Sequence, residues 1–185
     1  GMGQVYKAID SEDGSVVAIK FLLPGADEKC MERLRIEARE HASLRHSNIV
    51  RLIDFLSYEE HDFLVMEYMD GGNLKEFIAT SPELKDTLNM FAQACAGLDY
   101  IHNQGLVHRD LKPENLLLNK LGELKIADLG MVRRTDSAPD HRLTSMGQLV
   151  GSTYFMAPEQ ILRSEVTPAA DLYAIGVTLF EAITG

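Results

Sequence analysis

The chain has 185 residues, of which 45% are hydrophobic and 25% are charged, and its net charge at pH 7 is -10. This length is enough to bury a sizeable core, and the composition is typical of a globular protein. The acidic balance argues against a nucleic-acid-binding protein, because no basic excess is present to displace counterions from a phosphate backbone.

Targeting signals and cysteines are uninformative. The longest apolar candidate, 172–183, is too short to cross a bilayer and contains Glu181. No signal peptide is visible, and the first residue is Gly1, so we expect the true N-terminus to be absent. Cys30 and Cys95 lie 65 positions apart without metal-type spacing, which favours reduced thiols. We expect a cytoplasmic protein, or the cytoplasmic domain of a larger, membrane-anchored one.

The first part of the chain is rich in predicted strands. Asp13 and Gly14 form a hairpin signal, Asp27 is a candidate helix cap, and Gly71 with Gly72 breaks the pattern. The predicted elements are strands at 5–8 and 16–21, a helix from 28 to about 45, and strands at 49–56 and 62–68.

The second part is mainly helical. Apolar residues recur every three or four positions from Leu84 to Ile101, which predicts one long amphipathic helix that Gly105 ends. Two short strands are expected at 116–118 and 124–126, a polar loop at 133–148, and a helix at 170–184 that is apolar nearly all round and therefore buried. These elements predict an α+β fold with a sheet-rich lobe, a hinge near 67–72 and a helical lobe.

The most informative segment is 108–115, which reads His-Arg-Asp-Leu-Lys-Pro-Glu-Asn. Asp110 can accept the proton of a hydroxyl whose oxygen attacks phosphorus. Lys112 can neutralise charge on the transferred phosphate, and the amide oxygen of Asn115 suits Mg²⁺. Asp128 follows a predicted hairpin that would return it beside Asn115 as a second metal ligand, although Asp128-Leu129-Gly130 taken alone would be a turn.

Over essentially its whole length the chain resembles a eukaryotic-type protein kinase catalytic domain. The resemblance implies transfer of the γ-phosphoryl group of ATP, with Mg²⁺, to a Ser or Thr hydroxyl of a protein substrate. Lys112-Pro113-Glu114 has the form seen in Ser/Thr kinases. The segments 2–8 and 157–160 resemble bacterial eukaryote-like Ser/Thr kinases, although several eukaryotic groups come close.

The resemblance also implies that Lys20, in Val17-Ala18-Ile19-Lys20, contacts the α- and β-phosphates. Its expected partner is Glu37 rather than Glu32 or Glu40, because Glu37 lies nine residues before a segment at 46–50 that resembles the family's post-helix motif. An ordinary surface ion pair is the alternative interpretation.

An adenine pocket is implied in the same way. Val5, Ala18 and Leu117 would make apolar contacts on the two faces of the ring, and backbone groups of Glu67 and Met69 would hydrogen-bond to its edge. The side chain of Met66 would guard the space behind the ring, and Gly3 would be the last glycine of the loop over the phosphates. On pattern alone these are ordinary core residues.

Regulation is expected through the polar loop. Arg109 could pair with a phosphate on that loop, and Thr144 or Ser145 is the hypothesised acceptor, with simple solvated hydroxyls as the alternative. Ser152 stands where the family usually has Thr, and its hydroxyl could hydrogen-bond toward the catalytic loop. Asp171 resembles the residue that braces the backbone of that loop.

The resemblance covers only the middle of a kinase domain. We expect truncation at both ends, with 1–69 as a sheet-rich lobe lacking its first strand and 70–185 as a helical lobe lacking its last helices, and an isolated chain that is poorly stable. The alternatives are a pseudokinase or scaffold, and a small-molecule phosphotransferase of related fold. A nucleic-acid partner is not expected, nor is a membrane segment.

Overall fold

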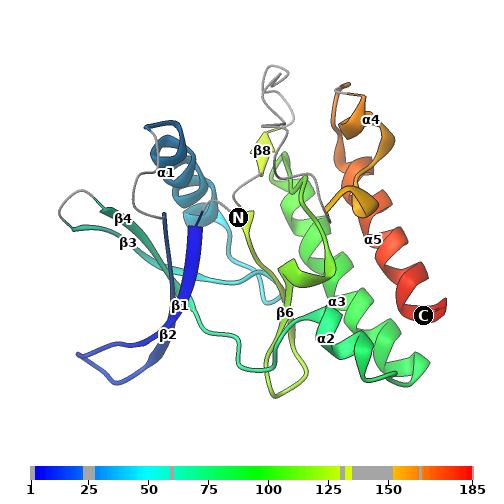
Figure 1. Ribbon diagram of the computed structural model, residues 1–185, viewed down its shortest axis with the longest axis horizontal. Helices are drawn as coiled ribbons and strands as arrows, with labels where there is room; N and C mark the ends of the chain where they lie inside the picture. The colour runs from blue at the N-terminus through cyan, green and yellow to red at the C-terminus, as the bar shows by residue number, and fades with distance from the viewer. Residues whose placement is uncertain are drawn as a thin grey trace.

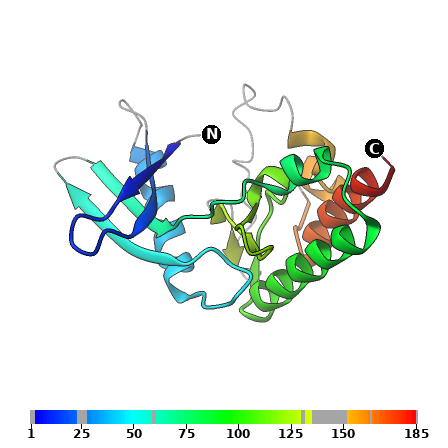
Figure 2. The same ribbon diagram turned by 90° about the horizontal axis from the view of Figure 1, so that it is seen from below.

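The computed structural model describes residues 3–22, 28–58, 61–129, 132–134, 152–162 and 164–184. A four-stranded sheet and one helix form one part, and most of the helices form the other (Figure 1). The view turned by 90° shows the two parts side by side, joined by the segment that follows the fourth strand (Figure 2). The predicted α+β organisation is therefore confirmed.

The sheet comes from the first third of the chain. Its strands β1 (Gly3–Ile9), β2 (Val16–Leu22), β3 (Leu52–Tyr58) and β4 (His61–Glu67) are antiparallel in the order β1-β2-β4-β3. Gly14 has a φ of 74° in the β1–β2 connection, a conformation that costs glycine little. This order places β2 in the interior of the sheet, where Lys20 lies opposite Val5 on one side and Leu64 on the other.

Helix α1 (Glu28–Ser43) packs against β3 and β4. Leu34 and Ala38 on this helix share a buried cluster with residues of the sheet, including Leu64 and Met66. The helical periodicity of the sequence predicted this element, while Asp27, its candidate cap, lies outside the described residues.

The strand predicted at 49–56 begins later, at Leu52. Ile49 instead forms a parallel bridge with Ile126 of the other part, because the amide of Val50 donates to the Ile126 carbonyl and the amide of Ile126 donates to the Asn48 carbonyl, both at 2.9 Å. An apolar run therefore supplies a connection between the two parts rather than one longer strand.

The helical part is built around α3 (Leu84–Asn103), which confirms the predicted long helix. Helix α2 (Leu74–Ala79) was not predicted; it begins after Asn73, whose side chain accepts a hydrogen bond from the amide of Glu76. The remaining elements are β5 (Leu106–Val107), a 3₁₀ turn η1 (Pro113–Asn115), β6 (Leu116–Leu118), β7 (Leu124–Ile126), β8 (Arg133–Arg134), a 3₁₀ turn η3 (Ser152–Phe155), α4 (Pro158–Ile161) and α5 (Pro168–Thr184).

Two expectations for this part need correction. The start of the segment expected as a loop, Arg133–Arg134, is a strand that pairs with β5. Helix α5 is not buried all round: Ala174 and Ile175 lie in the core, whereas Leu172 and Phe180 are 56% and 69% exposed. Its second apolar face has no cover among the described residues.

One close approach fixes α3 against the rest of the fold. A Cβ on Gly97 would lie 2.7 Å from the carbonyl oxygen of Asn48 and 2.9 Å from Cδ1 of Ile126. Only a residue without a side chain lets the helix approach this segment so closely. Within the described residues, no helix is long and apolar enough to cross a membrane. Cys95 is a free, exposed thiol.

Candidate active site

The segment between β5 and β6 brings three predicted site residues together. The ammonium Nζ of Lys112 donates to Oδ2 of Asp110 at 2.8 Å. Asn115 donates from Nδ2 to the main-chain carbonyl of Asp110 at 2.7 Å and to its Oδ2 at 3.3 Å. Asp110 is partly exposed, so its carboxylate is held by two side chains yet reachable from outside.

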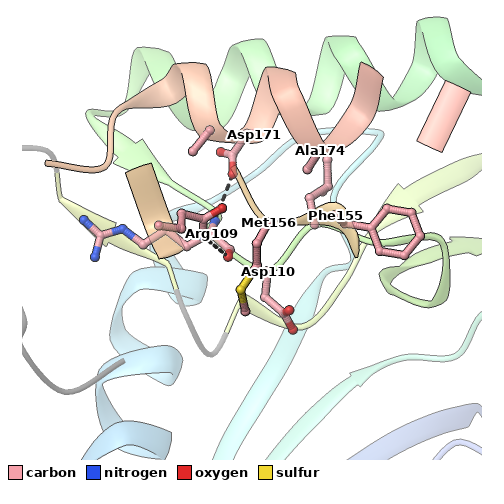
Figure 3. Close-up of a pocket in the computed structure, with 9 residues that line it drawn as sticks. Arg109, Asp110, Phe155, Met156, Asp171 and Ala174 are labelled. Carbon is pink, nitrogen blue, oxygen red and sulfur yellow. Dashed lines mark hydrogen bonds between the residues drawn. The ribbon is translucent and has the colours of Figure 1, made fainter. Parts of the chain in front are cut away.

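The backbone of this loop is strained at Arg109, whose φ is 70°. A left-handed conformation of a non-glycine residue costs roughly 1–2 kcal/mol. The carboxylate of Asp171 on α5 offsets that cost by accepting the amides of His108 at 2.8 Å and Arg109 at 2.9 Å. The predicted bracing role of Asp171 is confirmed, and Figure 3 shows its carboxylate on the opposite side of the loop from that of Asp110.

Burial works against the charge of Asp171, since it disfavours a carboxylate. Its hydrogen bonds outweigh that effect and lower the pKa of the carboxyl below its usual value. Besides the two loop amides, Nε2 of His102 lies 2.8 Å from Oδ2 of Asp171. The carboxylate therefore stays ionised at neutral pH and holds the loop.

Gln160 and His102 are positioning residues that the sequence analysis did not identify. Gln160 Nε2 donates to the main-chain carbonyl of Arg109 at 2.7 Å, and its Oε1 accepts the amide of Ala157 at 3.1 Å. His102 reaches Asp171 from α3. His102 belongs to no short motif, and the resemblance of the segment 157–160 assigned no role to Gln160; the position of each residue in the fold reveals the role.

The crevice drawn in Figure 3 lies between this loop, the segment around Phe155 and Met156, and α5. It holds about 10 Å³, the space of one water-sized sphere. It is therefore part of the packing that supports the loop, not a ligand pocket.

His108 is a structural residue of the loop. It is fully buried, with Nε2 3.1 Å from the carbonyl of Ala127 and Nδ1 3.4 Å from the amide of Asp110. With these partners, Nε2 is placed to donate to the Ala127 carbonyl and Nδ1 to accept the Asp110 amide. Leu129, the residue after Asp128, is buried in the core cluster.

Lys20 joins three segments of the chain. Its Nζ lies 2.6 and 2.9 Å from the two carboxylate oxygens of Glu37 on α1 and 2.7 Å from Oδ1 of Asp128. The side chains of Lys20 and Glu37 are 16% and 5% exposed, so this is not a surface ion pair. The choice of Glu37 as the partner of Lys20 is confirmed by this geometry.

The electrostatics of this cluster favour a charged lysine. Burial alone would lower the pKa of Lys20, but the carboxylates of Glu37 and Asp128 outweigh it and raise that pKa. Burial raises the pKa of Glu37, more than the neighbouring ammonium lowers it. For Asp128 burial acts in the same direction, yet Lys20 dominates and lowers the pKa. Two carboxylates thus share one ammonium.

Asp128 has a φ of 58°, and its side chain is 45% exposed. Its backbone follows β7, which pairs with β6, and the amide of Ala127 donates to the carbonyl of Asn115 at 2.8 Å. The predicted hairpin therefore does return the chain beside Asn115. In the described residues no group of three or more His, Cys, Asp or Glu side chains could form a metal site by itself.

The donor set nevertheless fits Mg²⁺, which binds through one or two carboxylates, waters and substrate phosphates rather than through an all-protein cage. Asp128 offers an exposed carboxylate, and Asn115 uses its Nδ2 toward Asp110, which leaves its amide oxygen for a ligand. These two residues are the candidate metal ligands.

Four of the residues implied in adenine binding lie in or against one apolar cluster. Ala18, Met69 and Leu117 pack against the buried cluster that contains Met66. Asn73 bridges to Leu117, which places β6 directly beside the segment that follows β4. The sequence pattern alone could not show that residues 18, 69 and 117 share one surface.

Val5 and Gly3 lie on β1, where Val5 is 61% exposed opposite Lys20 and Gly3 pairs with Leu22. Glu67 ends β4, and its side chain bonds elsewhere: both carboxylate oxygens lie 2.8 Å from Nζ of Lys125. Any contact of Glu67 with a nucleotide is thus left to its main chain, as the sequence analysis expected.

Of the proposed regulatory residues, Arg109 is described in full and Ser152 in its main chain only. Figure 3 shows the Arg109 guanidinium directed away from Asp110. Thr144 and Ser145 lie outside the described residues, and so does the side chain of Ser152, although its main chain begins η3.

Comparisons with known proteins agree with the arrangement of the site described above. A family model described as "Protein kinase domain" matches residues 1–185. Over this whole chain, probable serine/threonine-protein kinase pknA2 of Bifidobacterium longum is 38% identical and is covered over 25% of its length. Serine/threonine-protein kinase PknA of Mycobacterium tuberculosis is 37% identical with 44% covered, and PrkC of Bacillus subtilis is 35% identical with 29% covered. The chain thus spans less than half the length of these curated relatives.

Proposed function

This chain belongs to the protein kinase domain family, and from that premise we propose that its protein transfers the γ-phosphoryl group of ATP to a Ser or Thr hydroxyl of a protein substrate. Kinase domains use ATP and a divalent metal ion, and Mg²⁺ is the metal we propose here. The observation that carries the proposal is the cluster of Lys20, Glu37 and Asp128, together with the loop that holds Asp110.

The residues divide the work between positioning and charge. Lys20, oriented by Glu37, would bind the α- and β-phosphates. Asn115 and Asp128 would hold Mg²⁺, which would supply positive charge that offsets the charge of the phosphates when bound. Binding of the metal requires Asp128 to share its carboxylate between Lys20 and the ion, which its exposure permits.

Asp110 would accept the proton of the substrate hydroxyl and orient its oxygen toward phosphorus. Lys112, 2.8 Å from Asp110, would stabilise negative charge on the transferred group and keeps the Asp110 carboxylate oriented. Because Asp171 and Gln160 fix the main chain of this loop, these side chains are preorganised, which is the main protein contribution to phosphoryl transfer.

Nucleotide specificity would come from the cluster around Ala18, Met69 and Leu117 and from main-chain groups of Glu67 and Met69. Met66 would guard the space behind the ring, and Val5 and Gly3 would cover the nucleotide from β1. The cytoplasm is the compartment we propose for this domain, because ATP is available there.

Transfer of radiolabelled phosphate from ATP to a general protein substrate tests the proposal. We expect label on Ser and Thr with the full-length protein, and a loss of about 10²–10⁴-fold with Asp110→Asn, the range that a positioned acid or base contributes. Asp99→Asn, at an exposed position of α3, is the matched control and should keep full activity.

The outcomes separate the alternatives. ATP binding without any transfer, in both the wild type and Asp110→Asn, would identify a pseudokinase. Label on a small molecule such as an aminoglycoside, with none on protein, would identify a phosphotransferase of related fold.

Regulation by phosphorylation of the segment that contains Thr144 and Ser145 is part of the proposal, with Arg109 as the partner of the phosphate. Mass spectrometry after incubation with ATP should find phosphate at one of these residues. An active protein unmodified between residues 131 and 156 would contradict this part alone.

A further inference from the structure

A second cavity lies behind the segment that joins the two parts of the fold. It has a volume of about 330 Å³, at the lower end of the range for small-ligand sites. Its lining comes from the connection between α1 and β3, from the end of β4 and from β7. We call it the rear pocket; it is lined by Leu44, Arg45, His46, Ile49, Arg51, Glu67 and Lys125.

The charge of the rear pocket is opposite to that of the whole chain. Among the described residues that line it, Arg45, Arg51 and Lys125 are cationic and Glu67 is the one carboxylate, in a protein whose net charge is -10. Three cations gathered around one small cavity repel one another, so the arrangement is stabilised by any anion that enters.

Glu67 does not satisfy all three cations. Its two oxygens lie 2.8 Å from Nζ of Lys125, and Oε1 also accepts the main-chain amide of Arg51 at 2.6 Å. The guanidinium of Arg45 donates to the Leu44 carbonyl at 3.1 Å. Within the described residues neither arginine pairs with a carboxylate, so both guanidinium groups have donors to offer.

The walls of the pocket are already in place. Leu44 and Ile49, two of the residues that line it, are buried. The ring of His46 stacks on that of Tyr100, with centroids 5.1 Å apart, and the Tyr100 hydroxyl accepts the amide of Arg45 at 3.2 Å. Because α3 anchors the segment that carries both arginines, binding would require little ordering of the main chain.

We propose that the rear pocket binds a phosphate group, either free or carried on a phosphoserine segment of a protein. A phosphate monoester carries about 1.5 to 2 negative charges at pH 7, which matches the excess of cations over carboxylate in the pocket. Two guanidinium groups supply the forked donors that bind phosphate oxygens, and Lys125 adds a point charge. The site is distinct from the cluster around Lys20 and Asp128.

Titration of the full-length protein with inorganic phosphate, followed by the ³¹P NMR linewidth, tests the proposal without ATP and independently of kinase activity. We expect saturable binding that Arg51→Gln and Arg45→Gln each weaken about tenfold. Arg39→Gln, at an exposed position of α1 outside the pocket, is the matched control and should bind as the wild type does. Circular dichroism checks that each variant is folded.

Glu67→Gln provides a test in the opposite direction. Removing the only carboxylate of the pocket releases Lys125 toward the phosphate, so affinity should rise several-fold. Unchanged affinity in both arginine variants, or no gain in Glu67→Gln, would overturn the proposal.

A fluorescent phosphoserine peptide, compared with its unphosphorylated form by anisotropy, identifies the source of the phosphate. Tighter binding of the phosphopeptide than of inorganic phosphate, with the same dependence on Arg51, assigns the pocket to a phosphorylated protein segment. Equal or weaker binding assigns it to a small phosphate. If neither probe saturates, the proposal fails.

Discussion

Lys20 and Asp128 lie 108 residues apart in the chain, and their charged atoms are 2.7 Å apart in the structure. The contact joins β2, an interior strand of the sheet, to the segment that leaves β7 in the helical part. Since Lys20 also holds Glu37 on α1, one ammonium links the sheet, its helix and the proposed metal ligand. The relative placement of the two parts therefore governs the candidate site.

Because Lys20 has both a structural partner and a proposed phosphate contact, we expect a double variant to recover stability without recovering activity. Lys20→Met leaves Glu37 buried without its cation, a change that typically costs about 3–5 kcal/mol. Lys20→Met with Glu37→Leu replaces the pair by apolar side chains, and its melting temperature should return most of the way to the wild-type value. Phosphoryl transfer should stay reduced about 10²–10³-fold in both variants, because the contact to phosphate is missing.

Thermal melting and labelled-phosphate transfer measured side by side check this prediction. Lys85→Met, at an exposed position of α3, is the control for removing a surface lysine. Recovery of activity in the double variant would show that Lys20 has a structural role only.

The contact that holds α1 against the sheet should affect kinase activity, because α1 carries Glu37. Arg35 on this helix donates from Nε to Oδ2 of Asp62 at 2.8 Å, and Asp62 is buried at the start of β4. Arg35→Gln weakens the tie between helix and sheet and should allow Glu37 to move from Lys20, with a several-fold lower kcat/KM for ATP. Steady-state kinetics provide the test, and Arg39→Gln on the same helix should match the wild type; equal kinetics for the two variants would contradict the prediction.

Asp171 predicts a specific dependence of stability on pH. Its pKa in the folded protein is below the ordinary 3.8, so it stabilises the fold at higher pH, and this stabilisation is lost as the pH falls through the lowered pKa. Asp171→Asn should lower the melting temperature at pH 7. The difference from the wild type should shrink once the pH falls below about 4.

Melting curves at several pH values measure this difference. Activity adds a second readout, since a loosened loop at Arg109 should lower kcat more than it raises KM for ATP. A difference in melting temperature that is constant from pH 7 to pH 3 would rule out Asp171 as the source of the stabilisation.

Gly97 predicts a stability effect remote from the site. In Gly97→Ala the new methyl group would meet the main-chain oxygen of Asn48, which cannot turn aside as a side chain can. Forcing extra volume into a packed interior costs about 1–3 kcal/mol, more than the roughly 1 kcal/mol that alanine gains over glycine in a helix. Chemical denaturation should show a lower unfolding free energy, whereas Gly176→Ala, at an open position of α5, should be neutral or stabilising.

Local patterns in the sequence were sufficient for the longest helix and for the catalytic loop. The periodicity from Leu84 to Ile101 predicts α3, and the residue types at 108–115 predict a phosphoryl-transfer site, because both signals involve neighbours within a few positions. The choice of Glu37 came from the family resemblance, and the structure places that residue against Lys20.

Only the tertiary structure decided how distant residues use these elements. Ile49 reads as part of a strand, yet its pairing with Ile126 depends on hydrogen bonds between the two parts of the fold. The Glu67 carboxylate turns toward Lys125, and Gln160 donates to the main-chain carbonyl of Arg109, 51 residues before it. Periodicity in the sequence shows which face of a helix or strand is apolar. It does not show which group hydrogen-bonds to a buried charge or a loop amide. Each buried polar group needs a hydrogen-bond partner, and packing of the whole fold decides which residue supplies it.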